Sequence, residues 1–159
     1  MNRKEYNHSV DELSDGLYNF ALRYTASPTQ SSDAVQDSFV ALWEHRGEVK
    51  ACNAKKWLMR VLYHRLVDQH RYQSRLSQMP APDTAVAQHE SFELSDSLQL
   101  ALAALPEVQR SLVLLRDLEG YAYREMASML NITEQQVMVY LYRARQTMKK
   151  VLTNELDLR

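Results

Sequence analysis

The clearest pattern of apolar and polar positions in the chain lies between Tyr121 and Lys150. In its first half, apolar side chains recur at helical spacing and predict one buried stripe: Tyr123, Met126, Ala127 and Leu130. Asn131 follows this stripe, and Asn is one of the few residues that accept the left-handed conformation that ends a helix. Thr133 and Gln136 then have the spacing of a capping box. The pattern predicts a helix, a tight turn and a second, capped helix.

The second helix has two faces of different character. Its apolar residues at i, i+4, i+7 and i+11 predict a buried face: Val137, Leu141, Ala144 and Met148. The remaining outward face is mainly polar: Gln135, Gln136, Val139, Tyr142, Arg143 and Gln146. Amides near the start and an arginine near the end suit a recognition helix in the major groove of DNA. Helix pairs with short turns also occur in proteins that never bind nucleic acid, so the turn alone leaves DNA binding open.

Three helices are predicted in the first half of the chain. A capping box of Ser9 and Glu12 opens the first, whose apolar positions follow at helical spacing: Leu13, Leu17, Phe20 and Tyr24. Residues 26–32 are predicted as a turn. The second helix starts near Asp33, ends around residues 46–47 and carries these apolar positions: Val35, Phe39, Leu42 and Trp43. Asn53 is expected to cap the third, over about residues 54–73, with this apolar stripe: Leu58, Val61, Leu62 and Leu66.

Two helical domains and a linker account for the whole chain. Pro80 and Pro82 interrupt any helix in residues 77–91, and no apolar periodicity crosses that stretch. A helix over residues 95–105 follows, and Pro106 suits the first position of the next helix, which ends at Gly120. The sequence therefore predicts one domain over residues 1–76, a linker over 77–94 and a second domain over 95–159.

Composition agrees with an all-α fold and gives little support to catalysis. The 159 residues include only 3 Gly and 4 Pro, too few for the many turns of a sheet protein. Cys52 is the only cysteine, and the five histidines lack metal-ligand spacing. No glycine-rich phosphate loop or nucleophile motif is present, so we expect no enzyme activity, metal or cofactor. With no membrane-length apolar run and no signal peptide in residues 1–20, a cytoplasmic protein is expected.

Charge is distributed unevenly along the chain. The formal net charge of −1 divides into +2 for residues 1–76, −4 for 77–100 and +1 for 101–159. An acidic segment thus separates two weakly basic ones. Phosphate neutralisation drives non-specific DNA binding, so this weak basicity does not favour a free-standing tight DNA binder. It suits a protein that reaches DNA as part of a larger assembly.

Three fragments in this order resemble a known family. The segments are DAVQDSFVALWE at 33–44, KKWLMRVLYHRLVDQHR at 55–71, and the stretch from ALPEVQR to YRAR at 104–145. Together they resemble the extracytoplasmic-function group of bacterial RNA polymerase sigma factors, over about residues 10–75 and 95–151. The resemblance implies two helical domains that correspond to the second and fourth conserved regions of larger sigma factors. It further implies three partners: core RNA polymerase, promoter DNA and an anti-sigma protein.

The resemblance also assigns functions to residues of the first domain. The helix over 33–44 would dock on a coiled coil of the largest polymerase subunit, through acidic and amide groups: Asp33, Gln36, Asp37 and Glu44. Phe39, Leu42 and Trp43 are expected to face the core instead, and so is Trp57. The third helix would hold the melted minus-ten element through cationic and planar groups. These residues are Lys55, Lys56, Arg60, Tyr63, His64, Arg65 and Arg71. His64 stands where the family usually has Asn.

In the second domain the resemblance implies contact with the minus-thirty-five element. The expected contacts to bases or phosphates come from the recognition helix and its cap: Thr133, Gln135, Gln136, Val139, Arg143, Arg145 and Lys149. The family commonly places Lys and Arg in the middle of this helix, where this chain has Met138 and Tyr140. Both are expected on the flanks of the outward face.

Two other interpretations remain open at this point. A helical regulator that binds duplex DNA as a dimer would not need the acidic helix over 33–44 or a separate site for a DNA strand. A helical adaptor that binds only proteins would not need the basic cluster from Arg143 to Lys150. Binding to core polymerase would distinguish a sigma factor from the dimeric regulator, and binding to DNA would distinguish it from the protein-binding adaptor.

Overall fold

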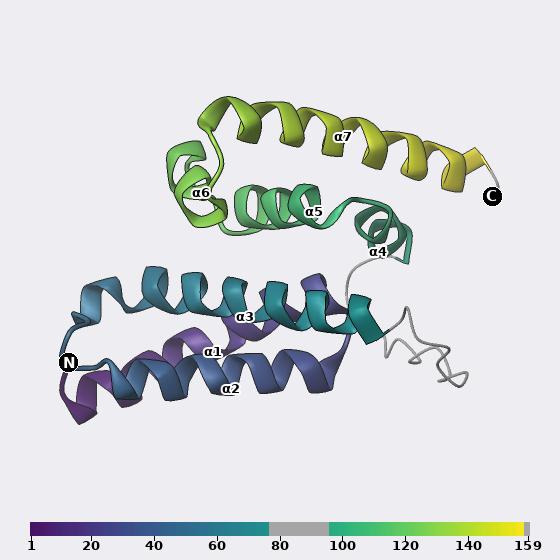
Figure 1. The fold of residues 1–159 in the computed structure, drawn as a ribbon. Coiled ribbons are helices and arrows are strands. Elements are labelled where there is room, and N and C mark those ends of the chain that lie inside the picture. The colour runs from purple at the N-terminus through teal and green to yellow at the C-terminus, as the bar shows by residue number, and fades with distance from the viewer. Residues whose placement is uncertain (77–95, 158–159) are drawn as a thin grey trace. The chain divides into compact units, whose positions relative to one another are not determined.

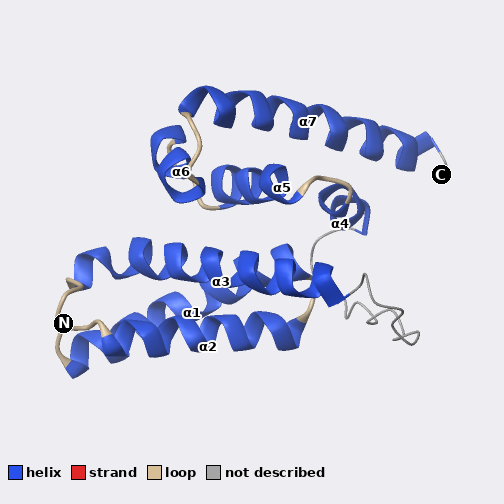
Figure 2. Ribbon diagram, in the orientation of Figure 1, coloured by secondary structure: helices blue, strands red, loops and turns tan. Residues whose placement is uncertain are grey.

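The computed structural model of the chain describes residues 1–76 and 96–157. All regular structure in these residues is helical (Figure 2), which confirms the predicted all-α fold. The elements in chain order are α1 (Arg3–Thr25), α2 (Pro28–Glu44), the 3₁₀ turn η1 (Ala51–Asn53), α3 (Ala54–Leu76), α4 (Asp96–Ala103), α5 (Glu107–Val113), the π turn η2 (Leu114–Leu118), α6 (Tyr123–Leu130) and α7 (Glu134–Asp157). The chain divides into two compact units, Met1–His89 and Glu90–Arg159. The predicted linker, residues 77–94, lies wholly outside the described residues.

The first unit is a bundle of three long helices. Helices α1, α2 and α3 each pack against the other two (Figure 1). The largest fully buried side chains come from all three helices: Phe20, Leu42, Leu58, Met59, Leu62 and Leu66. Burial of this apolar surface at about 25 cal/mol per Å² is the main stabilising term of such a bundle. The outer faces of α2 and α3 are thereby left for other contacts.

Helix α1 begins earlier than the sequence predicted. Asn2, not Ser9, is the cap. Its side-chain oxygen accepts a 2.8 Å hydrogen bond from the Glu5 backbone amide, and the Glu5 carboxylate accepts a 2.9 Å bond from the Asn2 backbone amide. Ser9 lies in the second turn, where its hydroxyl donates to the Glu5 carbonyl. Two sequences with the spacing of a capping box are present, at residues 2–5 and 9–12, and the one nearer the N-terminus forms.

The corner between α1 and α2 is also shorter than predicted. Only Ala26 and Ser27 lie between the helices, because Pro28 occupies the first turn of α2, where its fixed φ is already helical. Ala26 adopts the left-handed conformation, at φ 58°. The Ser27 hydroxyl caps α2 by accepting a 3.3 Å bond from the Gln30 amide. The predicted turn over 26–32 is therefore mostly the first turn of a helix.

The expectation that three apolar residues of α2 face the core is right for two of them. Phe39 and Leu42 are buried, but Trp43 is exposed. Its ring makes an edge contact with Tyr6 at 4.9 Å and lies 4.0 Å beneath the guanidinium of Arg46. Trp57, the other tryptophan expected in the core, is half-buried and contacts the His45 ring.

The second unit packs α4, α5 and α6 against the long helix α7. The largest fully buried side chains of its core come from α5, η2, α6 and α7: Leu112, Leu115, Met126, Val137 and Leu141. Pro106 precedes α5 as its N-cap instead of occupying the first helical position. The predicted helix over 106–120 changes to the wider π form at η2, and Gly120 then has φ 70°. None of the described helices is long and apolar enough to cross a membrane.

One side chain closes the C-terminal end of the short helix α4. The guanidinium of Arg110 donates to the carbonyl of Leu102 at 3.0 Å and to that of Leu105 at 3.2 Å. The last carbonyls of a helix have no partner within it, so these bonds satisfy groups that would otherwise be unpaired. Arg110 thus links the end of α4 to α5.

Candidate nucleic-acid interface

The helix–turn–helix of the second unit forms as the sequence predicted. Asn131 ends α6 in the left-handed conformation, at φ 56° and ψ 47°. Thr133 and Gln136 make both bonds of a capping box: the Thr133 amide donates to Gln136 Oε1 at 2.9 Å, and the Gln136 amide donates to Thr133 Oγ1 at 3.1 Å. Helix α7 therefore starts in a fixed register relative to α6.

The two faces of α7 also match the prediction. Val137, Leu141 and Ala144 are at most 1% exposed, and Met148 is half-buried. The outward side chains are all exposed: Gln135, Gln136, Val139, Tyr142, Arg143 and Gln146. The two predicted flanking residues differ, since Tyr140 is half-buried while Met138 is more exposed than Val139. The sequence pattern placed Met138 on the flank of the outward face and did not predict that its side chain would be this exposed.

The capping box limits what Gln136 and Thr133 can offer to DNA. An amide that holds adenine by two bonds must present both its oxygen and its NH₂ group. The oxygen of Gln136 already accepts the Thr133 amide, so one of its two lone pairs and the NH₂ group are left, and the bond fixes how the amide is oriented. Thr133 Oγ1 accepts a bond within the box and retains one hydroxyl proton for a phosphate. Gln135, with no such bond among the described residues, keeps its whole amide.

The basic residues of α7 differ in their partners. Arg145 pairs with Asp117, with 3.1 Å between Nη2 and Oδ1, and both side chains are about half exposed. Arg143 and Lys149 are exposed. Within the described part of the chain, the side chains of Arg143 and Lys149 have no ion pair or hydrogen bond. Arg143 is therefore the outward cation on α7 whose guanidinium is uncommitted, whereas Arg145 must exchange a partner to reach a phosphate.

In the first unit, α3 presents a cationic stripe to solvent. Arg60, His64 and Arg71 are exposed and recur at i, i+4 and i+11, so they lie on one face. Arg75, which the sequence analysis did not select, extends the same face at i+15 and is exposed. Its spacing of four residues from Arg71 was the available signal.

Two residues predicted for this face lie elsewhere. Tyr63 is only 6% exposed, because it stands one turn from Met59 and one from Val67 in the buried stripe of α3. Its side chain is therefore packed within the first unit. Arg65 turns toward α2 and lies 3.7 Å from Asp37, so its charge is partly neutralised by a residue predicted for polymerase binding. Both residues therefore lie apart from the exposed stripe of α3.

Lys55 and Lys56 stand at the start of α3 instead of along its stripe. Both are exposed in the first turn, where the backbone N–H groups carry a partial positive charge. Two lysines at a helix N-terminus form a region attractive to phosphate. These two lysines and the exposed stripe of α3 together provide basic side chains over most of the length of the helix.

Helix α2 carries the predicted acidic residues on a single outward stripe. Asp33, Asp37 and Glu44 recur at i, i+4 and i+11, and Gln36 lies beside them; all four are exposed. Val40 occupies the i+7 position of this stripe and is exposed as well. The sequence analysis missed Val40, although its position outside the buried series of α2 was a usable signal. The stripe combines acidic groups around one apolar side chain.

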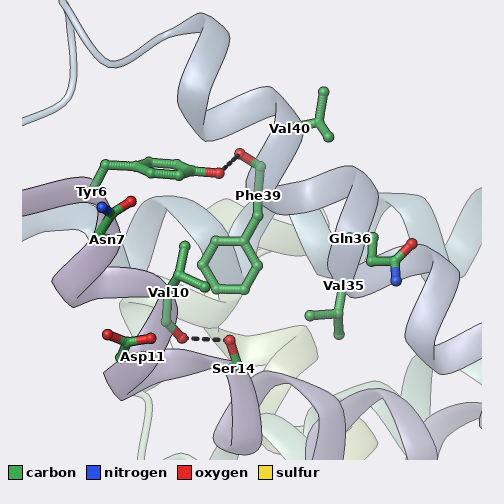
Figure 3. A pocket seen from close by; sticks show the side chains of 9 residues that line it. All are labelled: Tyr6, Asn7, Val10, Asp11, Ser14, Val35, Gln36, Phe39 and Val40. Carbon is green, nitrogen blue, oxygen red and sulfur yellow. Dashed lines mark hydrogen bonds between the residues drawn. The ribbon is translucent and has the colours of Figure 1, made fainter. Parts of the chain in front are cut away.

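A groove runs beside this stripe, between α1 and α2. Figure 3 shows its lining, which comes from both helices: Tyr6, Asn7, Val10, Asp11, Ser14, Val35, Gln36, Phe39 and Val40. The Tyr6 hydroxyl donates to the Phe39 carbonyl at 2.9 Å, and the Ser14 hydroxyl donates to the Val10 carbonyl. These bonds tie the two hydroxyls to backbone carbonyls, and the apolar part of the lining comes from Val10, Val35, Phe39 and Val40.

Two further features of the described residues concern potential metal ligands and a buried tyrosine. No group of three or more potential metal ligands is found there. Burial raises the pKa of Tyr121 to about 12, with a smaller contribution from the charges of Glu119 and Glu125. Tyr121 is buried in the connection between η2 and α6, so this shift bears on the stability of the second unit.

Comparison with known proteins places both units in one family. Residues 10–76 match the family Sigma-70 region 2, and residues 95–148 match Sigma-70, region 4. The ECF RNA polymerase sigma factor SigE of Mycolicibacterium smegmatis is 28% identical over 159 residues, covering 91% of this chain and 62% of SigE. The ECF RNA polymerase sigma factor SigL of Mycobacterium tuberculosis is 26% identical over 155 residues, covering 89% of this chain and 85% of SigL. The chain thus spans less than two thirds of the length of SigE but most of SigL.

Solved structures show the same fold. The sigma factor RpoE of Bartonella quintana, in complex with the anti-sigma factor NepR, superposes with a TM-score of 0.76 at 24% identity, covering 94% of this chain and 98% of RpoE. CnrH, in complex with the cytosolic domain of CnrY, gives a TM-score of 0.71 at 21% identity, covering 96% and 90%. With the helix–turn–helix, the order of the two units and these relatives in agreement, the chain belongs to the extracytoplasmic-function group of RNA polymerase sigma factors.

Proposed function

We propose that this chain is an alternative sigma factor that binds core RNA polymerase and directs promoter-specific initiation of transcription. The observation that carries the proposal is the presence of both sigma regions in order, each with an exposed face of suitable chemistry. The chain would act in the cytoplasm, as an initiation factor without catalytic activity of its own. The chemistry of RNA synthesis would belong to the polymerase.

The polymerase-binding surface in this proposal is the outward stripe of α2. Its acidic groups, Asp33, Asp37 and Glu44, would face basic residues of the polymerase, and Val40 would supply the apolar contact between them. Interfaces of this kind concentrate binding energy in a few central side chains, while charges at the rim mainly set orientation and association rate. Gln36 would contribute hydrogen bonds at the edge of the stripe.

The promoter-binding surfaces are the stripe of α3 and the outward face of α7. Arg60, His64 and Arg71 would track the backbone of the melted minus-ten strand, with Lys55 and Lys56 at the start of the helix. Arg65 would contribute only by leaving Asp37. At the minus-thirty-five element, Gln135, Val139 and Arg143 would contact base edges. The cap residue and the later cations would contact phosphates: Thr133, Gln136, Arg145 and Lys149.

An anti-sigma partner is part of the proposal. RpoE of Bartonella quintana was solved with the anti-sigma factor NepR, and CnrH with the cytosolic domain of CnrY. A protein that covers the α2 stripe or the α7 face of this chain would hold it inactive. Co-purification of the tagged chain from its own cells, followed by identification of stoichiometric partners, tests this part.

The test of the central proposal is competition for core polymerase. The purified chain is mixed with core enzyme that lacks any sigma subunit, and increasing amounts of the primary sigma factor are added. We expect a stable complex that the primary sigma factor displaces, because the two would share the same docking surface. A folded chain that neither binds core enzyme nor competes would contradict the proposal and favour a stand-alone DNA-binding regulator.

A further inference from the structure

The outward face of α7 contains an apolar patch that the capping box and the cations do not explain. Met138, Val139 and Tyr142 are 54%, 44% and 66% exposed within two turns of the helix. They are neighbours on the surface, since Val139 and Tyr142 are three residues apart and Met138 and Tyr142 are four apart. A single exposed apolar residue needs no explanation, but three adjoining ones on a predicted DNA-binding face do.

The patch lies along the middle of the outward face. Gln135, Val139, Tyr142 and Gln146 recur at i, i+4, i+7 and i+11, which is the spacing of the buried stripe on the opposite side. Val139 is in the second turn of α7, where recognition helices contact base edges. Polar amides therefore stand at both ends of the stripe, and apolar groups stand in its centre.

The base edges of the major groove offer one apolar group, the C5-methyl of thymine. We propose that Val139, with Met138 and Tyr142 beside it, recognises thymine in the minus-thirty-five element by packing against this methyl group. The inference rests on the proposed function and names the chemical feature that the recognition helix would select. The family's more usual Lys and Arg at the middle of this helix would instead favour contacts with guanine or phosphate.

Charge supports DNA as the occupant of this face instead of an apolar protein surface. Arg143 and Lys150 lie on one side of the stripe and Lys149 on the other, all of them exposed. Cations on both sides of an apolar centre complement two phosphate backbones on either side of a row of base edges. Gln136 Oε1 already accepts one bond in the cap, so this amide is less free to turn toward a base than the side chains of the apolar patch.

The test removes one methyl group from the DNA and one side chain from the protein. Duplexes with a randomised upstream hexamer are first selected with the whole chain bound to core polymerase, and the selected element is then resynthesised with deoxyuridine in place of thymidine. Deoxyuridine lacks only the C5-methyl. We expect the wild-type complex to bind the deoxyuridine duplex about fourfold more weakly per contacted thymine, as the loss of one buried methyl predicts.

Two variants make the comparison specific. Val139→Ala removes the proposed contact at an exposed site with a better helix former, and we expect it to bind thymine and deoxyuridine duplexes equally. Val108→Ala is the matched control, because Val108 is 40% exposed in the same unit but lies on α5. This variant should keep the fourfold preference for thymine.

Three outcomes would overturn the inference. These are a selected element without thymine, a wild-type complex indifferent to deoxyuridine, or a Val139→Ala variant that keeps the full preference. In each case sequence-specific selection would still leave the proposed function standing, and the apolar patch would then fit a protein partner. If no element is selected at all, the proposed function fails and this inference fails with it.

Discussion

Among the outward residues of α7, Arg143 is the side chain whose loss should separate DNA recognition from polymerase binding. It is exposed, and no described residue engages its guanidinium, so replacing it leaves the fold intact. We expect Arg143→Ala to reduce promoter-specific transcription by about tenfold or more, in line with the loss of one good contact to a base. Binding to core polymerase should remain unchanged, since the α2 stripe is untouched.

The control for this substitution is Arg3→Ala, which removes an exposed arginine from the start of α1. In vitro transcription and core binding are measured side by side for both variants. An equal loss of transcription and core binding in Arg143→Ala would mean that the residue supports the second unit as a whole. The assignment to the minus-thirty-five element would then be withdrawn.

Tyr121 should make the stability of the second unit depend on alkaline pH. Its pKa is raised to about 12 by burial, so the folded state holds the hydroxyl proton more tightly than the unfolded state, where the pKa is near 10. The stabilisation is therefore complete below pH 10 and is lost as the pH rises from about 10 to 12. At pH 11 the linkage relation gives a loss of about 1 kcal/mol.

Tyr121→Phe isolates this contribution because it keeps the ring and removes the titrating hydroxyl. The free energy of unfolding from urea titrations is compared between the wild-type chain and the variant at pH 8 and pH 11. The wild-type chain should lose about 1 kcal/mol more than the variant over this interval. Identical losses would show that the hydroxyl titrates alike in the folded and unfolded chains.

Residues were the level at which sequence reasoning was least reliable. The pattern placed the cap pair Thr133 and Gln136 correctly, because a capping box is a local arrangement of adjacent residues. It could not place Arg65 or Tyr63, because each lies near the border between two faces of α3. Which side of that border is covered depends on how α2 packs, and spacing along one helix does not contain that information.

At the scale of elements, the capping box should determine how firmly α7 is held at its start. Thr133→Ala removes the acceptor for the Gln136 amide, and loss of an N-cap typically costs about 1 kcal/mol. Thr133→Ser keeps the acceptor and serves as the control. Urea unfolding followed by circular dichroism should show the loss for alanine only, and a loss of similar size for serine would assign the effect to the threonine methyl.

The acidic stripe of α2 should be the element that polymerase recognises. Asp33→Lys reverses one exposed charge of the stripe, and we expect core binding to weaken by about tenfold at low salt and less at high salt. Asp15→Lys makes the same change at an exposed site on α1. Equal effects from the two variants would point to the total charge of the unit instead of the stripe.

The long helices could be predicted from periodicity, while their ends depended on local chemistry. The stripes of α1, α2, α3 and α7 are amphipathic over many turns, so their existence followed from the sequence. The starts of α1 and α2 did not, because Asn2 and Ser27 compete with other polar residues that could serve as caps. The π turn Leu114–Leu118 also escaped prediction, since an apolar pattern does not distinguish it from one more α turn.

At the scale of the whole molecule, neither unit carries enough positive charge to bind DNA tightly by itself. The chain has 19 basic and 20 acidic residues, and part of the basic set is paired within the fold. We therefore expect the free chain to bind its promoter at least about 100-fold more weakly than the polymerase complex does, since few phosphates would be neutralised. Fluorescence anisotropy with the same labelled duplex measures both affinities.

A scrambled duplex of the same length is the control for that comparison. If the free chain binds the promoter as tightly as the complex does, its two DNA-binding faces need no polymerase to act together. Such a result would favour a dimeric regulator that binds duplex DNA.

The order of two domains and a linker could be proposed from the sequence, because Pro80, Pro82 and the acidic segment interrupt all helical periodicity.

The ion pair between Asp117 and Arg145 bears on how the protein would search a chromosome. A promoter competes with millions of other sites, so occupancy depends on the ratio of specific to non-specific affinity. Asp117 neutralises a cation next to the DNA-binding face and places a negative charge where any phosphate must approach. This penalty applies to every sequence alike, whereas contacts to bases repay it only at the correct site. The carboxylate would thus shorten the time spent on the wrong DNA, and a chain with Asn at position 117 would bind DNA more tightly yet find its promoter less often.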